Sequence, residues 1–144
     1  MHSLYTHLGL NISIDEIIKN VKYTQGGGTL GVLLGQEAQS QGLQAVIYTH
    51  NLMVFDPSWF DLTNEELIEK LLLQAKSKKD NKVIEASLYY AEFLKNGGDI
   101  LFENLKPEFL YKTLSKYGPV ICGLSATYLY MSKREFGGKL CIHI

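Results

Sequence analysis

The 144-residue sequence lacks the features that mark several large classes of protein. It has no surplus of basic residues, because 14 Lys and Arg face 15 Asp and Glu, so we expect no nucleic-acid partner and no anionic membrane surface. Its apolar runs fall short of the roughly 20 residues that cross a bilayer. It also lacks a charged segment followed by an apolar run, which would mark a secretory signal. These absences favour a cytoplasmic protein without a membrane span.

Cysteine is scarce, and both cysteines, Cys122 and Cys141, lie in apolar runs near the C-terminus. Two thiols in such surroundings indicate buried side chains rather than a disulfide or a metal site, which again favours the cytoplasm. We therefore expect no disulfide framework.

Motifs for metals and nucleotides are also missing. His2, His7 and His50 are scattered without the spacing of metal ligands. The loop at residues 26–29 is rich in glycine, but it lacks the Gly-Lys-Ser/Thr that contacts phosphate and magnesium. The sequence therefore predicts neither a metal nor a cofactor.

Apolar residues make up 46% of the chain and charged residues 20%, which is an ordinary globular mixture. A chain of this length can bury roughly two-thirds of its unfolded surface. There is no internal repeat and no linker. We therefore expect one domain over residues 1–144.

The spacing of apolar residues predicts helices first and strands mainly later. Ser13 is expected to cap one helix, Thr29 another, and Thr63 with Glu66 to form a capping box for a third. The expected helices cover residues 1–8, 14–21, 30–40, 63–75, 81–95 and 107–116, and the expected strands cover residues 43–49, 100–102, 120–124 and 140–144. This order predicts an α+β fold in which N-terminal helices are followed by a mostly antiparallel sheet.

The block at residues 118–135, GPVICGLSATYLYMSKRE, is the most informative stretch of the sequence. Residues 120–124 have the length and β-branched content of a buried strand, so Cys122 is expected to be an inert thiol in the core. Three polar or aromatic residues that follow this strand are expected to line a groove: Thr127, Tyr128 and Tyr130.

This block resembles the strand and loop of the C39-like branch of the papain-like cysteine peptidases. A second match lies upstream, where Gly9, the Ser-Ile-Asp-Glu-Ile of residues 13–17 and the Gly-Gly-Thr of residues 27–29 follow in the family's order. The resemblance implies a papain-like fold. It also implies hydrolysis of peptide or amide bonds by a thiolate, with a histidine that shuttles the proton.

The family's nucleophile precedes the position of Gly9 by about a dozen residues, so no residue of this chain takes that place. The resemblance makes His143 the candidate catalytic histidine, although neither its preceding nor its following residue matches the family. Cys141 lies two residues from His143, so on a strand both side chains would share one face and could form a thiol–imidazole pair. A half-buried edge strand is the alternative interpretation of these two residues.

We therefore interpret the sequence as a C39-like domain, incomplete at its N-terminus and possibly at its C-terminus. A truncated thiol hydrolase and a product that has lost catalysis both remain open. The alternative is a non-catalytic module that binds a peptide or protein on the same fold. An exposed core or sheet edge would also permit a homo-oligomer.

Overall fold

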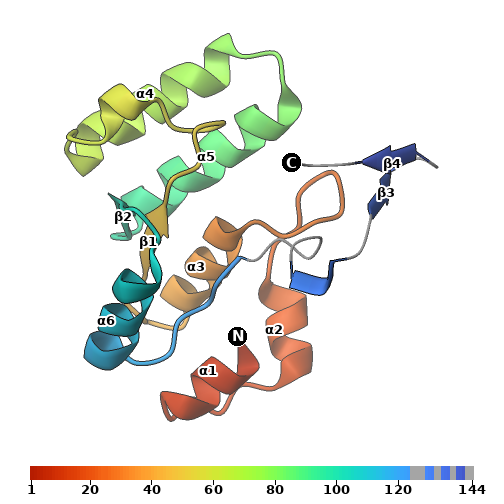
Figure 1. The fold of residues 1–144 in the computed structure, drawn as a ribbon, viewed down its shortest axis with the longest axis vertical. Helices are drawn as coiled ribbons and strands as arrows, with labels where there is room; N and C mark the ends of the chain where they lie inside the picture. The colour runs from red at the N-terminus through yellow and green to blue at the C-terminus, as the bar shows by residue number, and fades with distance from the viewer. Residues whose placement is uncertain (124–128, 132–133, 137–138, 142–144) are drawn as a thin grey trace.

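The computed structural model describes residues 1–123, 129–131, 134–136 and 139–141 (Figure 1). The helices are α1 (His2–His7), α2 (Ile14–Asn20), α3 (Gly31–Ser40), α4 (Asn64–Ser77), α5 (Asn81–Lys95) and α6 (Pro107–Tyr117), with a 3-10 turn η1 (Pro57–Trp59). The strands are β1 (Val46–Thr49), β2 (Asp99–Phe102), β3 (Arg134–Phe136) and β4 (Lys139–Cys141). The prediction of a mixed α+β chain is confirmed at this level, and all six expected helices are present.

The prediction of a mostly antiparallel sheet is wrong for the strands that meet the core. Strand β1 pairs with β2 in parallel, from Val46 opposite Asp99 to Thr49 opposite Phe102. A parallel pair needs a long crossover, and helices α4 and α5 provide it between the two strands. The antiparallel pair is the short β3–β4 hairpin near the C-terminus.

Two of the expected helix caps have the geometry that the sequence predicts. The Ser13 hydroxyl accepts a hydrogen bond from the backbone N–H of Glu16, whose carboxylate accepts from the Ser13 N–H. Thr63 and Glu66 form the same capping box at the start of α4. Each carboxylate accepts from a backbone N–H and a hydroxyl, and these bonds lower the pKa values of Glu16 and Glu66.

The prediction that Thr29 caps α3 is wrong by one residue. Leu30 occupies the cap position with an extended backbone, and its side chain makes no capping hydrogen bond. The first turn of α3 carries Val32 and Leu33, and both side chains are almost fully buried. Their burial stabilises the start of this helix, which has no polar cap.

The main cluster of buried side chains lies between α3, α4, α5 and β2. Its members are Val32, Leu33, Val54, Phe55, Leu67, Leu71, Ala86, Tyr90, Ala91, Phe93, Leu94 and Ile100. Phe93 is 0% exposed, and its ring lies against Gly35 of α3 and Gly98 before β2. An added Cβ would lie 2.9 Å from this ring at position 35 and 2.4 Å from it at position 98. Glycine at these two positions therefore lets α3 and the residue before β2 lie close to the Phe93 ring of α5.

The N-terminal cluster is smaller and contains the buried residues Tyr5, Ile17 and Val21 of α1, α2 and the residue after α2. Figure 1 shows α3 between α1–α2 and α5, so this helix contributes to both clusters. Ile14 and Ile18, which the helical period also assigns to the apolar stripe of α2, are each 55% exposed. The apolar stripe is present in the sequence, but Ile14 and Ile18 remain more exposed than buried among the described residues.

The predicted buried strand at residues 120–124 is wrong where the structure describes it. Helix α6 ends at Tyr117, the C-cap Gly118 has a φ of +86°, and residues 119–123 have no regular secondary structure. Cys122 is exposed rather than buried. A buried strand must pair its backbone groups with a neighbour, and residues 119–123 join neither pair of strands in the described chain.

Candidate functional site

Most of the residues that the sequence predicts as a site lie outside the described residues. These are His143, Thr127 and Tyr128, and for Cys141 only its place on β4 is described. Tyr130 is described and its side chain is exposed. The proposed Cys141–His143 pair and the groove at Thr127, Tyr128 and Tyr130 therefore stay predictions.

One hollow of the molecule lies between the first helix and the segment after α6. This N-terminal groove has a volume of about 360 Å³ and is lined by Met1, Ser3, Leu4, His7, Pro119, Val120 and Ile121. Its walls come from segments that are far apart in the sequence. The beginning of the block at residues 118–135 thus lies against α1.

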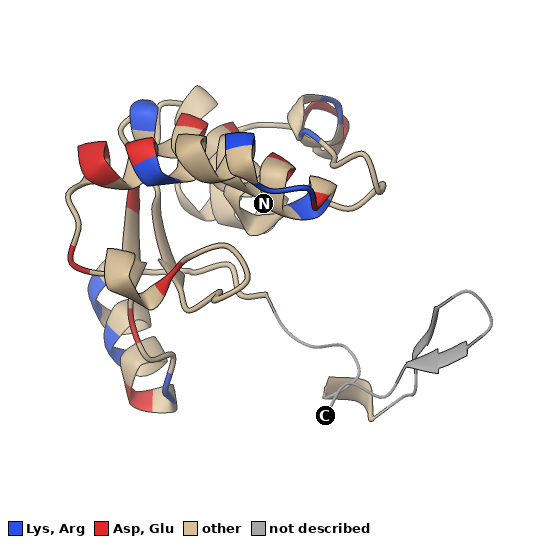
Figure 2. Ribbon diagram, turned by 90° about the horizontal axis from the view of Figure 1, so that it is seen from above, with Lys and Arg blue, Asp and Glu red and all other residues tan. Residues whose placement is uncertain are grey.

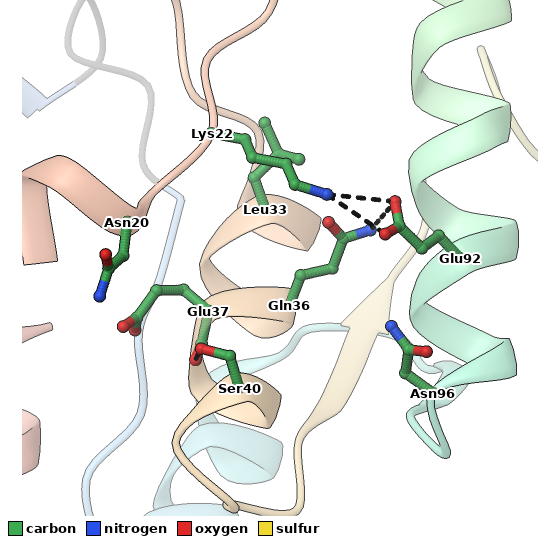
Figure 3. A pocket seen from close by; sticks show the side chains of 8 residues that line it. All are labelled: Asn20, Lys22, Leu33, Gln36, Glu37, Ser40, Glu92 and Asn96. Carbon is green, nitrogen blue, oxygen red and sulfur yellow. Dashed lines mark hydrogen bonds and ion pairs between the residues drawn. The ribbon is translucent and has the colours of Figure 1, made fainter.

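A second hollow lies over α3, and Figure 3 shows its lining. This α3 groove has a volume of about 190 Å³ and is lined by Asn20, Lys22, Leu33, Gln36, Glu37, Ser40, Glu92 and Asn96. Helix α3 forms its base, while the end of α2 and the last turns of α5 form its sides. Seven of these eight side chains are polar, so the α3 groove is a hydrogen-bonding surface.

Glu92 of α5 is the centre of one polar network in the α3 groove. The Lys22 ammonium lies 3.2 Å and 3.4 Å from its two carboxylate oxygens. The side-chain amide nitrogen of Gln36 donates to the Tyr89 carbonyl at 2.8 Å and to Glu92 Oε2 at 3.3 Å. The side chains of Lys22 and Glu92 are 56% and 47% exposed, so their ion pair is well solvated and contributes little to stability.

Glu37 forms a second network and is only 4% exposed. Its carboxylate accepts hydrogen bonds from the Tyr5 hydroxyl and from the side-chain amide of Gln41. Tyr5 belongs to α1 and is fully buried, so this contact joins the N-terminal cluster to α3. Donors to both carboxylate oxygens offset the cost of removing the charge from water.

Sequence reasoning missed the residues of the α3 groove. Glu37 follows Leu30 and Leu33 on one helical face, at i+7 and i+4, so the period itself places this carboxylate inward. A charged residue on an apolar face was the available signal. The contact from Lys22 to Glu92 spans 70 residues and has no comparable signal in the sequence.

Metal binding and membrane spanning can be checked directly on the part of the chain that is described. There, the His, Cys, Asp and Glu side chains form no group of three that could hold a metal ion. Within the same residues, none of the helices is both long and apolar enough to cross a membrane. Figure 2 shows acidic and basic residues interspersed over the helices.

Comparison with known proteins gives no significant match to a family model, a curated protein or a solved structure. The resemblance to C39-like peptidases therefore remains a hypothesis that depends on the two sequence blocks. The geometry of the two grooves is the remaining basis for a functional proposal.

Proposed function

We propose that this chain is a papain-like domain of the C39 type, from the class of thiol peptidases and amide hydrolases. The observation that carries the proposal is the N-terminal groove, in which α1 lies against Pro119, Val120 and Ile121. The resemblance implies a nucleophile on the first helix and a histidine after the block at residues 118–135. Contact between that helix and the start of that block supports the proposal, because the family draws its catalytic residues from these two parts of the chain.

The reaction needs a thiolate that attacks an amide carbonyl and an imidazolium that protonates the leaving amine. Cys141 and His143 could take these roles in a different arrangement that does not use the first helix, since they are two residues apart near the C-terminal end. Cys122 is the other thiol, and it follows directly after the lining of the N-terminal groove. The substrate expected for this class is a peptide or protein.

A peptide mixture tests the proposal when its cleavage and its retention are measured together by mass spectrometry. Iodoacetamide labelling of both thiols is followed in parallel across pH. We expect labelling of Cys141 to stay fast near pH 6, as a stabilised thiolate does, and to slow in His143→Ala. Cleavage should be lost in Cys141→Ala and retained in Cys122→Ala, which serves as the matched control.

A specific observation favours a second candidate, a peptide-binding module without catalysis. Strands β1 and β2 form a two-stranded sheet in the described chain, so each strand has an edge whose backbone groups could pair with an added strand. Peptides that are retained but not cleaved, with both thiols labelling only above about pH 8, would favour this module. If the peptides are neither retained nor cleaved, both candidates are overturned.

The same open sheet edge could pair with another copy of this chain. Sedimentation velocity over a range of concentrations would detect such a homo-oligomer. A mass that stays at one chain would exclude it and leave the edge to peptide ligands.

A further inference from the structure

Gln36 of the α3 groove has one end of its side-chain amide satisfied and the other end free. Its nitrogen donates to the Tyr89 carbonyl and to a carboxylate oxygen of Glu92. Neither of these acceptors carries a hydrogen, so the amide cannot be turned over without losing both bonds. The orientation of the Gln36 amide is therefore fixed by its partners. Figure 3 shows the amide nitrogen turned toward Glu92 and the oxygen turned away from it.

The Gln36 oxygen that results is a buried acceptor, and it has no hydrogen-bond partner among the described residues. Buried polar atoms in native proteins are nearly always paired, because an unpaired one has lost its water without compensation. Only a group that donates a hydrogen bond can satisfy this oxygen. The described side chains supply no such donor, so a water molecule or a ligand group has to provide it; the Gln39 oxygen, outside the lining of the α3 groove, has the same status.

The charges of the lining indicate what kind of donor fits. The lining contains two carboxylates, Glu37 and Glu92, and one ammonium, Lys22, so the α3 groove has a net negative charge. Lys22 contacts both oxygens of Glu92, yet it makes no hydrogen bond to the Gln36 oxygen. It is held by a half-exposed ion pair, which is weak enough to exchange. With Lys22 displaced, a cation would find the Glu92 carboxylate bonded only to the Gln36 amide nitrogen, with the unpaired Gln36 oxygen on the same amide.

We propose that the α3 groove binds the guanidinium group of an arginine side chain in place of the Lys22 ammonium. A guanidinium presents five N–H donors in a planar fork, so it can engage both Glu92 oxygens and the Gln36 oxygen together. An ammonium is a compact group, and the one already present satisfies Glu92 alone. Lys22 is then an internal competitor that a ligand must displace.

This site deepens the proposed function, since on that function the arginine belongs to a bound peptide. Binding of the guanidinium itself does not depend on cleavage. Water is the rival occupant, because a polar cavity of about 190 Å³ can hold several molecules, each with a share of roughly 30 Å³.

The test titrates N-acetyl-arginine methylamide into the 15N-labelled chain and follows the side-chain amide resonances of Gln36. We expect saturable shifts that are lost in Glu92→Gln. In Lys22→Ala we expect binding roughly two- to fivefold tighter, which is the competition that a half-exposed ion pair can offer. Lys95→Ala is the matched control, because it removes the same charge from α5 outside the lining of the α3 groove.

Three results would overturn the proposal. One is the absence of saturable shifts in both the natural chain and Lys22→Ala, which would mean that the α3 groove holds water only. Another is an equal response to the citrulline analogue, which has nearly the same shape without the charge. The third is equal tightening in Lys95→Ala, which would show a general charge effect instead of displacement. The probe is read by binding, so its failure and a failure of peptide cleavage are separate outcomes.

Discussion

The main cluster and the N-terminal cluster are built from the same kind of amphipathic helix, yet they bury very different amounts of side chain. Twelve buried residues form the main cluster, from α3, α4, α5, β2 and the loop at Val54 and Phe55. Three form the N-terminal cluster, which is tied to α3 by the buried contact between Tyr5 and Glu37. The difference shows that an apolar stripe predicts a helix, while the partner surface decides how much of that stripe is buried.

The difference also assigns the two clusters different roles in stability. Global stability should depend on the main cluster, while α1 and α2 should open locally at a lower free energy. The α3 groove lies where the two meet, so its geometry depends on the weaker one. Substitutions in each cluster can test this division.

The largest effect is expected for Phe93→Ala in the main cluster. The ring is 0% exposed and fills the space above Gly35 and Gly98, so its removal leaves a cavity. We expect a loss of about 3–5 kcal/mol in the free energy of unfolding, measured by urea denaturation. Leu73→Ala on the exposed face of α4 is the control and should change it by no more than about 0.5 kcal/mol. Equal effects of the two substitutions would contradict the proposed position of the core.

A smaller effect is expected for Tyr5→Phe in the N-terminal cluster. The substitution keeps the ring but leaves the buried Glu37 carboxylate without one of its donors. The expected loss is about 1–3 kcal/mol, with hydrogen exchange in α1 becoming faster. Tyr111→Phe, at an exposed position of α6, is the matched control and should be neutral. If Tyr5→Phe destabilised the protein as much as Phe93→Ala does, the two clusters would be one cooperative unit.

The same capping box occurs at α2 and at α4, so removing each cap compares the two clusters through one kind of interaction. Thr63→Ala removes the cap of α4, a helix of the main cluster, and should cost about 1 kcal/mol of global stability. Ser13→Ala removes the same cap from α2 and should act mainly on local hydrogen exchange there. Equal losses in the urea midpoint would remove the distinction between the clusters.

The acid dependence of stability provides a further measure of the α4 cap. The backbone N–H and then the hydroxyl of Thr63 donate to Glu66 and lower its pKa below the ordinary 4.5. The ionised form is thus favoured by folding, so its stabilisation is complete above pH 4.5 and is lost as pH falls through the lowered pKa. Glu66→Gln keeps a capping acceptor without the charge and should flatten this part of the curve.

The sequence predicted what depends on local interactions. Ser13 and Thr63 were found because a cap needs only residues three positions apart. Strand β2 was also expected, although its parallel pairing with β1 was not. Pairing depends on where the crossover through α4 and α5 returns the chain, and no local pattern contains that information.

The candidate site was harder to predict, for the same reason. The α3 groove combines residues of α2, α3 and α5, and its key contacts join positions 56 and 70 residues apart. Its donors and acceptors are common side chains that carry no motif. Of its lining, only Glu37 gave a signal, as a charge at the inward position after Leu33.

The smallest effect is expected for Cys122, where the sequence and the structure disagree most clearly. An apolar run predicted a buried thiol, but the structure places Cys122 on an exposed segment without regular structure. Cys122→Ala should therefore change the free energy of unfolding by no more than about 0.5 kcal/mol, because it creates no cavity. The Cys122 thiol should also react with iodoacetamide in the native protein, before any denaturant is added. A thiol that reacts only on unfolding, together with a loss of 1 kcal/mol or more on substitution, would show that residues 119–123 pack into a core after all.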